Sequence, residues 1–217
     1  MTDSIRIAIP LFDRLTALDA IGPYEVLQRL PGATVTFVAE RTGEFRTDNG
    51  FLGLNADATF DDLADPDVIV VPGGVGTRTL METSHPIHAW LQRAHETTRF
   101  TTSVCTGSLV LAAAGLLEGL TATTHWGAYQ VLEEHDVTPT GQRVVEHLDR
   151  RIITAAGVSS GIDMALRLSE LLVDDVAAKA MQLMVEYDPQ PPFDAGSVEK
   201  AGGEVMARLV AYSADKS

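Results

Sequence analysis

The stretch TTSVCTGSLVLAAAG, residues 101–115, decides the predicted fold because it joins a strand-like run to an apolar helix. Small and β-branched residues up to Val104 predict a strand, and the run from Gly107 predicts a helix. That helix is apolar on nearly every side, which indicates burial. Cys105, the single cysteine of the chain, lies in the turn between the two elements. A sharp strand-to-helix turn presents its central residue at the edge of a sheet, as in a nucleophile elbow.

The alternation of strands and helices continues on both sides of this stretch. Strands are predicted over residues 5–12, 33–40, 66–74 and 99–104, and hairpins over residues 47–57, with a tight turn at Asn49-Gly50, and 143–157. Helices are predicted over residues 85–96, 107–115, 160–172, 176–187 and 203–214, and over the second half of residues 17–30. This order predicts one α/β domain over residues 1–217, with a mostly parallel sheet and helices on both faces. In such sheets, ligands bind at the carboxyl ends of the strands.

The composition limits the classes of function. The chain has 217 residues, with 16 Lys+Arg against 30 Asp+Glu and a net charge of −14. No basic cluster is present, so nucleic acid is not expected as a partner. No apolar run is long enough to span a membrane, and the first residues do not form a signal peptide. One cysteine cannot form an internal disulfide, which favours a reducing, cytoplasmic setting.

Cys105 is predicted to be a nucleophile because a helix begins two residues after it. The partial positive charge of a helix N-terminus stabilises a thiolate, so the pKa of Cys105 is expected to be lowered. The alternative is a buried thiol that only fills the core, since free cysteine is among the most buried residue types.

Two further groups could complete a site around this thiol. The N–H groups of Gly73 and Gly74, in PGGVGT, could donate hydrogen bonds to charge that develops on a substrate. A phosphate-binding loop is less consistent with this segment, which lacks a Gly-Lys-Ser/Thr ending. Asp19 is an acid in an apolar stretch and could be a helix cap or a pocket residue. If Asp19 faces Cys105, burial and the thiolate would raise its pKa.

The neighbouring residues narrow the chemistry. Thr106, and not histidine, follows Cys105, so the Cys-His pair of cysteine peptidases is absent at this position. His125, in TATTHW, could be structural or catalytic. The EEHD segment, residues 133–136, points to several faces of a helix and predicts no metal site.

The chain resembles the ThiJ/PfpI superfamily along nearly its whole length and, within it, is most similar to the isocyanide hydratases. The matching stretches are LFDRLTALDAIGPYEVL, DVIVVPGGVGT, TTSVCTGSLVLAAAGLLEGLTATTHW and LMVEYDPQPPFDAGS. The third stretch also resembles the amino-terminal domains of some AraC-type regulators, whose helix-turn-helix domain would follow. No room for such a domain is expected before Ser217, and the tail resembles the hydratases.

The resemblance implies a flavodoxin-like three-layer sandwich, a homodimer, and no metal or organic cofactor. It implies that Cys105 is the nucleophile, that Asp19 replaces the glutamate of most members, and that Thr106 replaces their histidine. Phe193 and Asp194 are predicted in the pocket or at a dimer contact, with a proline-fixed packing loop as the alternative. The hydratases are richer in glycine where this chain has Ala155-Ala156, which could alter rate or helix mobility.

The expected activity is hydration of an isocyanide, R–N≡C, to an N-substituted formamide through a thioimidate on Cys105. Three alternatives stay open. The first is a ligand-sensing or regulatory module without catalysis. The second is another superfamily activity, such as glyoxal-type hydration, deglycation or peptide hydrolysis. The third is redox sensing by Cys105.

Overall fold

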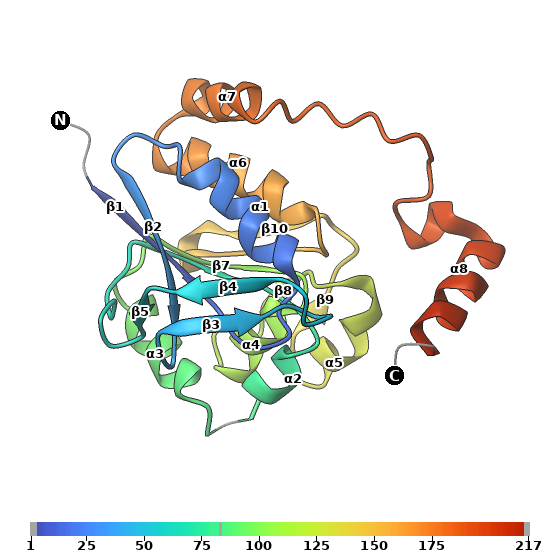
Figure 1. Ribbon diagram of the computed structural model, residues 1–217, viewed down its shortest axis with the longest axis horizontal. Coiled ribbons are helices and arrows are strands. Elements are labelled where there is room, and N and C mark those ends of the chain that lie inside the picture. The colour runs from blue at the N-terminus through green and yellow to red at the C-terminus, as the bar shows by residue number, and fades with distance from the viewer. Residues whose placement is uncertain (1–3, 83, 215–217) are drawn as a thin grey trace. The chain divides into compact units, whose positions relative to one another are not determined.

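β-branched and small apolar residues form the central sheet of the computed structural model, which describes residues 4–82 and 84–214 (Figure 1). Its strands are β1 (Ile5–Pro10), β2 (Ala33–Ala39), β5 (Ala58–Thr59), β6 (Val68–Val71), β7 (Phe100–Val104), β10 (Val144–His147) and β11 (Ile152–Ala155). They lie in the order β10-β11-β7-β6-β1-β2-β5. The pairs are parallel except β10 with β11, which form the predicted antiparallel hairpin. The predicted α/β fold with a mostly parallel sheet is therefore confirmed.

Helices cover both faces of this sheet (Figure 1). One face carries α1 (Ala17–Leu27), α6 (Ser160–Leu172) and α7 (Asp175–Met184), and α6 contacts both of the others. The other face carries α2 (Thr77–Leu80), α3 (Pro86–His95), α4 (Gly107–Ala113) and α5 (Tyr129–Glu133), with α4 in contact with the other three. Every residue of β6 is buried, as a central strand between two helical layers requires.

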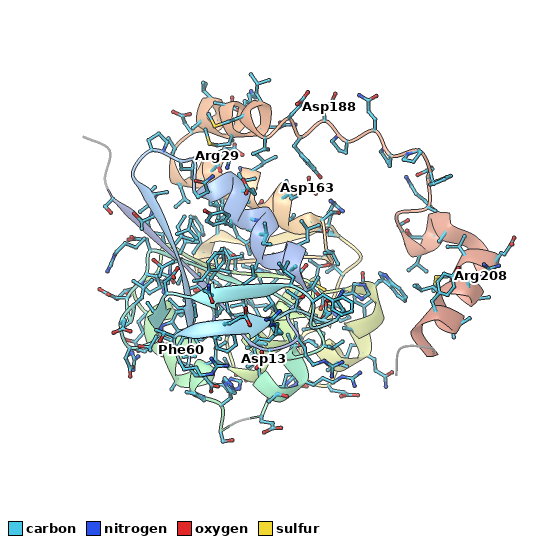
Figure 2. All side chains as sticks on the ribbon, viewed as in Figure 1. Asp13, Arg29, Phe60, Asp163, Asp188 and Arg208 are labelled. Carbon is cyan, nitrogen blue, oxygen red and sulfur yellow. The ribbon has the colours of Figure 1, made fainter. Side chains whose placement is uncertain are left out.

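The core is apolar, and the polar group of its buried tryptophan has a partner. Phe60, labelled in Figure 2, stacks on Trp90 with their ring centroids 4.8 Å apart. The indole N–H of Trp90 donates to the carbonyl of Leu63 at 3.0 Å, which satisfies the polar group of this buried ring.

The structure differs from the sequence prediction at the start of α1 and in the hairpin over residues 47–57. α1 begins at Ala17 and continues through Gly22 and Pro23, whereas only the second half of this segment was predicted to be helical. Both residues are buried, and a Cβ at Gly22 would lie 3.2 Å from Ile162 of α6, so helix packing outweighs their low helix propensity.

The hairpin over residues 47–57 also differs from the prediction. Its strands are β3 (Gly43–Arg46) and β4 (Gly53–Ala56), which pair antiparallel. Asn49-Gly50 does not form a tight two-residue turn but lies inside the loop of residues 47–52. A bridge between Thr47 and Leu15 ties the start of this loop to the segment after β1. A second short pair is formed by β8 (Thr121–Ala122) and β9 (Thr138–Pro139).

The chain divides into two compact units, residues 1–185 and 186–217. The second unit contains α8 (Val198–Ala214), which is interrupted at Gly202, where φ is +73°. The single domain predicted over residues 1–217 stays a prediction. Within the described ranges, no helix has both the length and the hydropathy needed to cross a bilayer.

Candidate active site

A cavity of about 530 Å³ lies where β6 and β7 end at their carboxyl edge, as expected for a parallel α/β sheet. This volume is within the range of small-molecule sites, roughly 300–1,000 Å³. The residues that line it are Thr16, Asp48, Gly74, Val75, Thr77, Arg78, Met81, Cys105, Thr106, Leu109, His125, Gly127, Ala128, Val131 and Val158. The cavity therefore contains the two adjacent residues on which the predicted chemistry depends, Cys105 and Thr106.

Cys105 occupies the strained turn that its sequence context predicts. It lies between β7 and α4, is 4% exposed, and has a φ of +57°, in the left-handed region. Such a conformation costs a non-glycine residue about 1–3 kcal/mol, so the surroundings must hold it. Its N–H donates to the carbonyls of Ala155 and Ala156 at 3.0 and 3.2 Å. Its carbonyl accepts hydrogen bonds from the hydroxyls of Thr124, at 3.0 Å, and Ser108, at 3.2 Å.

The elbow also requires a glycine at the start of α4. A Cβ on Gly107 would lie 2.1 Å from the carbonyl oxygen of Val71, at the end of β6. Because this neighbour is backbone, it could not move aside without disturbing the sheet. Gly107 thus allows α4 to begin directly against β6, which fixes the position of Cys105.

Asp19 is fully buried in α1 and lies beside the thiol of Cys105. Its Oδ2 accepts a hydrogen bond of 3.0 Å from the N–H of Gly73, and its Oδ1 is buried without a partner among the described residues. Burial raises the pKa of Asp19 to about 7, although hydrogen bonds from Gly73 and Cys105 act in the opposite direction. The carboxyl group can therefore gain and lose a proton near neutral pH.

The predicted lowering of the Cys105 pKa is wrong. Burial raises the pKa of this thiol, and the nearby charge of Asp19 raises it further. The backbone and side chain of Thr106 lower the pKa of Cys105 only in part, and α4 is a short helix of 7 residues. Desolvation and a like charge thus outweigh the helix end. At neutral pH the Asp19–Cys105 pair carries at most one negative charge.

Thr106 connects the segment that follows β7 to the segment that follows β6. Its Oγ1 accepts a hydrogen bond from the N–H of Gly74 at 2.9 Å and donates to the carbonyl of Gly74 at 3.2 Å. The N–H groups of Gly73 and Gly74 therefore both donate to protein side chains, Asp19 and Thr106. Their predicted role as donors to a substrate stays a prediction, and it would require these bonds to exchange.

His125, whose role the sequence left open, lines the same cavity as Cys105. Its Nδ1 accepts a hydrogen bond from the N–H of Gly127 at 3.2 Å, and burial lowers its pKa. A neutral ring with this bond is assigned a proton on Nε2. A Cβ on Gly157 would lie 2.5 Å from Cδ2 of His125 and 3.4 Å from Sγ of Cys105. The ring and the thiol therefore both lie close to Gly157.

Asp194, the remaining residue that the sequence predicts for the site, lies outside the unit of residues 1–185 that contains the cavity. Asp194 belongs to the second compact unit, where it is exposed and forms an ion pair with Lys200 at 2.6 Å. Its place in the pocket stays a prediction, as does that of Phe193. Asp48 and Arg78 line the cavity but were not predicted, since neither belongs to a recognisable motif.

The comparisons with known proteins agree with this geometry. The chain is 41% identical to the isonitrile hydratase of Pseudomonas putida over 203 residues, which cover 94% of this chain and 87% of that protein. The crystal structure of a ThiJ/PfpI family protein from Pseudomonas syringae has a TM-score of 0.90 and 36% identity, covering 98% of this chain and 87% of that one. The HTH-type transcriptional regulator GbdR of Pseudomonas aeruginosa is 32% identical over 117 residues, which are 54% of this chain and 31% of the regulator.

The match to the family model is longer than the match to the regulator. It extends over residues 5–171, from β1 to the end of α6, and includes Asp19, Gly73, Cys105 and Thr106. The superfamily predicted from the sequence is thus confirmed, and the chain belongs to the DJ-1/PfpI family.

Proposed function

We propose that the protein is an isocyanide hydratase, which adds water to R–N≡C and releases an N-substituted formamide. The observation that carries the proposal is the buried Asp19 carboxyl beside the thiol of Cys105, with Thr106 next to it at the cavity wall. The similarity to the Pseudomonas putida isonitrile hydratase over 94% of the chain supports the choice of substrate.

In the first step, the sulfur of Cys105 bonds to the terminal carbon of the isocyanide, and that carbon takes up a proton. The Asp19–Cys105 pair supplies both the sulfur nucleophile and the proton. After the pair has lost one of its two protons, the remaining proton is shared between the carboxyl and the thiol. The product is R–N=CH–S–Cys105, a thioimidate. Since Asp19 is fully buried and does not line the cavity, its proton reaches the substrate by way of the sulfur or of a bound water.

In the second step, water adds to the thioimidate carbon, and its proton passes to the nitrogen. The tetrahedral species R–NH–CH(OH)–S–Cys105 then breaks its carbon–sulfur bond, releases R–NH–CHO and restores the original proton on the pair. Covalent catalysis divides one difficult hydration into two easier additions. We propose that these intermediates are oriented by the Nε2–H of His125, by the N–H groups of Gly73 and Gly74, and by Thr106.

A ligand-sensing module is the main alternative from another class. The match to the regulator GbdR covers only about half of this chain, whereas the match to the hydratase covers 94% of it. Such a module would bind an isocyanide without converting it. Glyoxalase or deglycase activity would instead act on methylglyoxal.

The test is to incubate the protein with cyclohexyl isocyanide and to follow N-cyclohexylformamide by mass spectrometry, with methylglyoxal as a parallel substrate. We expect formamide from the wild type and none above background from Cys105→Ala or Cys105→Ser, with both variants folded by circular dichroism. Absence of turnover in the wild type, or unchanged turnover in Cys105→Ala, would overturn the proposal. Faster conversion of methylglyoxal would favour the other superfamily activity.

We also propose that the protein is a cytoplasmic homodimer. The single cysteine suits a reducing compartment. Large apolar side chains are exposed on α7, at Val176 and Leu183, and we propose that a second copy of the chain covers them. Light scattering coupled to size exclusion is expected to give twice the chain mass of 23.3 kDa, and a value of one chain mass would contradict the dimer.

A further inference from the structure

Arg78 is a cation on the cavity wall that has no partner among the described residues. It belongs to α2, is exposed, and lines the same cavity as Cys105. Among residues 4–82 and 84–214, it forms no ion pair, hydrogen bond or cation–π contact. Its guanidinium therefore presents all five donors to solvent or to a ligand in the cavity.

No acidic side chain of the described residues forms an ion pair with Arg78. Glu82 follows four residues later, beyond the end of α2 at Leu80, and the two side chains are not paired. Asp48, the acidic residue that lines the same cavity, instead accepts hydrogen bonds from the hydroxyl of Thr16, at 2.7 Å, and the N–H of Val75, at 3.4 Å. In a chain with 30 acidic and 16 basic residues, a cation that stays unpaired at a cavity is available for a ligand.

The rest of the wall sets the shape of that ligand. Met81, Leu109, Val131 and Val158 give the cavity an apolar lining, and its volume of about 530 Å³ exceeds what the isocyanide group alone needs. An apolar body therefore fits between the reacting carbon at Cys105 and the cation at Arg78.

We propose that the R group of the substrate is an apolar chain or ring that ends in an anionic group, a carboxylate, which Arg78 binds. A guanidinium and a carboxylate can form two parallel hydrogen bonds, which would fix the direction in which the substrate enters. Arg78 is then a specificity-determining residue. This inference rests on the proposed hydratase activity and adds the chemical class of its substrate.

The test compares isocyanides whose alkyl chains of increasing length end in a carboxylate with the methyl esters of the same compounds. For the wild type, kcat/KM is expected to be higher for the acid than for its ester by on the order of tenfold at one best chain length. In Arg78→Gln this preference disappears, mainly through a higher KM for the acid, so that acid and ester have similar kcat/KM values. Arg78→Lys keeps part of the preference because lysine keeps the positive charge but cannot form the two parallel hydrogen bonds of a guanidinium.

The matched control is Arg150→Gln, which removes the same charge from an exposed residue that does not line the cavity. It is expected to keep the full preference for the acid. Equal kcat/KM for acid and ester in the wild type, or an equal loss for both in Arg78→Gln, would overturn the inference and leave the hydratase proposal intact. If the wild type converts cyclohexyl isocyanide but hydrates neither the acids nor the esters, the inference fails and the hydratase proposal stands.

Discussion

The backbone N–H of Gly73 donates a hydrogen bond of 3.0 Å to Oδ2 of Asp19, which lies 54 residues earlier in the chain. This bond joins the end of β6 to α1. The bond from the N–H of Gly74 to Thr106 joins the same segment to the end of β7. Together they hold a buried carboxyl beside the Cys105 thiol, and the predictions below depend on that arrangement.

The first prediction concerns the pH dependence of turnover. The Asp19–Cys105 pair must lose one proton before the sulfur can attack, and the pKa of Asp19 is raised to about 7. We therefore expect kcat/KM to rise with pH with a midpoint near 7 and then to level off. Asp19→Asn, whose amide cannot ionise, should lose this rise and at least about a hundredfold in rate. Stopped-flow assays with cyclohexyl isocyanide measure both effects, and a wild-type profile in Asp19→Asn would remove Asp19 from the mechanism.

The second prediction concerns stability. The pKa of Asp19 is about 7 in the folded chain against an ordinary value of 3.8, so the folded state keeps a proton that the unfolded chain releases. The contribution of Asp19 to the free energy of unfolding is thus fullest below pH ~4 and is lost as the pH rises to about 7. Urea unfolding should show Asp19→Asn gaining stability relative to the wild type as the pH rises from about 4 to about 7.

The exposed Asp57, which forms no hydrogen bond with another described side chain, provides the control for this comparison. Asp57→Asn is expected to follow the wild type at every pH. A constant difference between the wild type and Asp19→Asn across the same range would contradict the raised pKa of Asp19.

The third prediction concerns the hydroxyl of Thr106. Thr106→Ala removes the acceptor of the Gly74 N–H and a hydroxyl that lowers the pKa of Cys105, so kcat/KM is expected to fall about tenfold. Thr106→Ser keeps the hydroxyl and should retain most of the activity. Steady-state kinetics on both variants decide the matter, because equal activities of the alanine and serine variants would show that the hydroxyl is not used.

The fourth prediction uses the space around Gly157. In Gly157→Ala the added methyl would lie 2.5 Å from the His125 ring, so the ring must move away from its place beside Cys105. We expect turnover to fall about tenfold while the fold is kept, since the obstructed group is a side chain. Gly141→Ala, whose methyl meets no atom within 4 Å, is the control and should be fully active. Normal turnover in Gly157→Ala would exclude a role for the His125 position.

Much of the fold could be predicted because its signals are local. The β-branched run of β6 and the apolar run of α4 each follow from a few adjacent residues, and Gly107 after Cys105 indicates the sharp turn between them. The start of α1 could not be predicted in this way. Gly22 and Pro23 disfavour a helix locally, and only packing against α6 stabilises it.

The electrostatics of the site also depend on contacts between distant segments. The helix end after Cys105 predicted a lowered thiol pKa, but burial and the charge of Asp19 raise it. Neither the depth of Cys105 nor its approach to α1 is encoded within a short window of sequence. Asp48 and Arg78 were missed for the same reason, since a cavity wall is assembled from loops that follow different strands.

The sequence by itself determined the alternation of elements, the position of Cys105 at a strand-to-helix turn, and Thr106 in place of histidine, because periodicity and glycine placement act over a few residues. The tertiary structure alone decided that Asp19 meets Cys105, that the pKa values of both groups rise, and that Arg78 lines the cavity without a partner among the described residues. Desolvation and charge interactions depend on distance in space, and the ends of parallel strands bring together residues that are far apart in the chain.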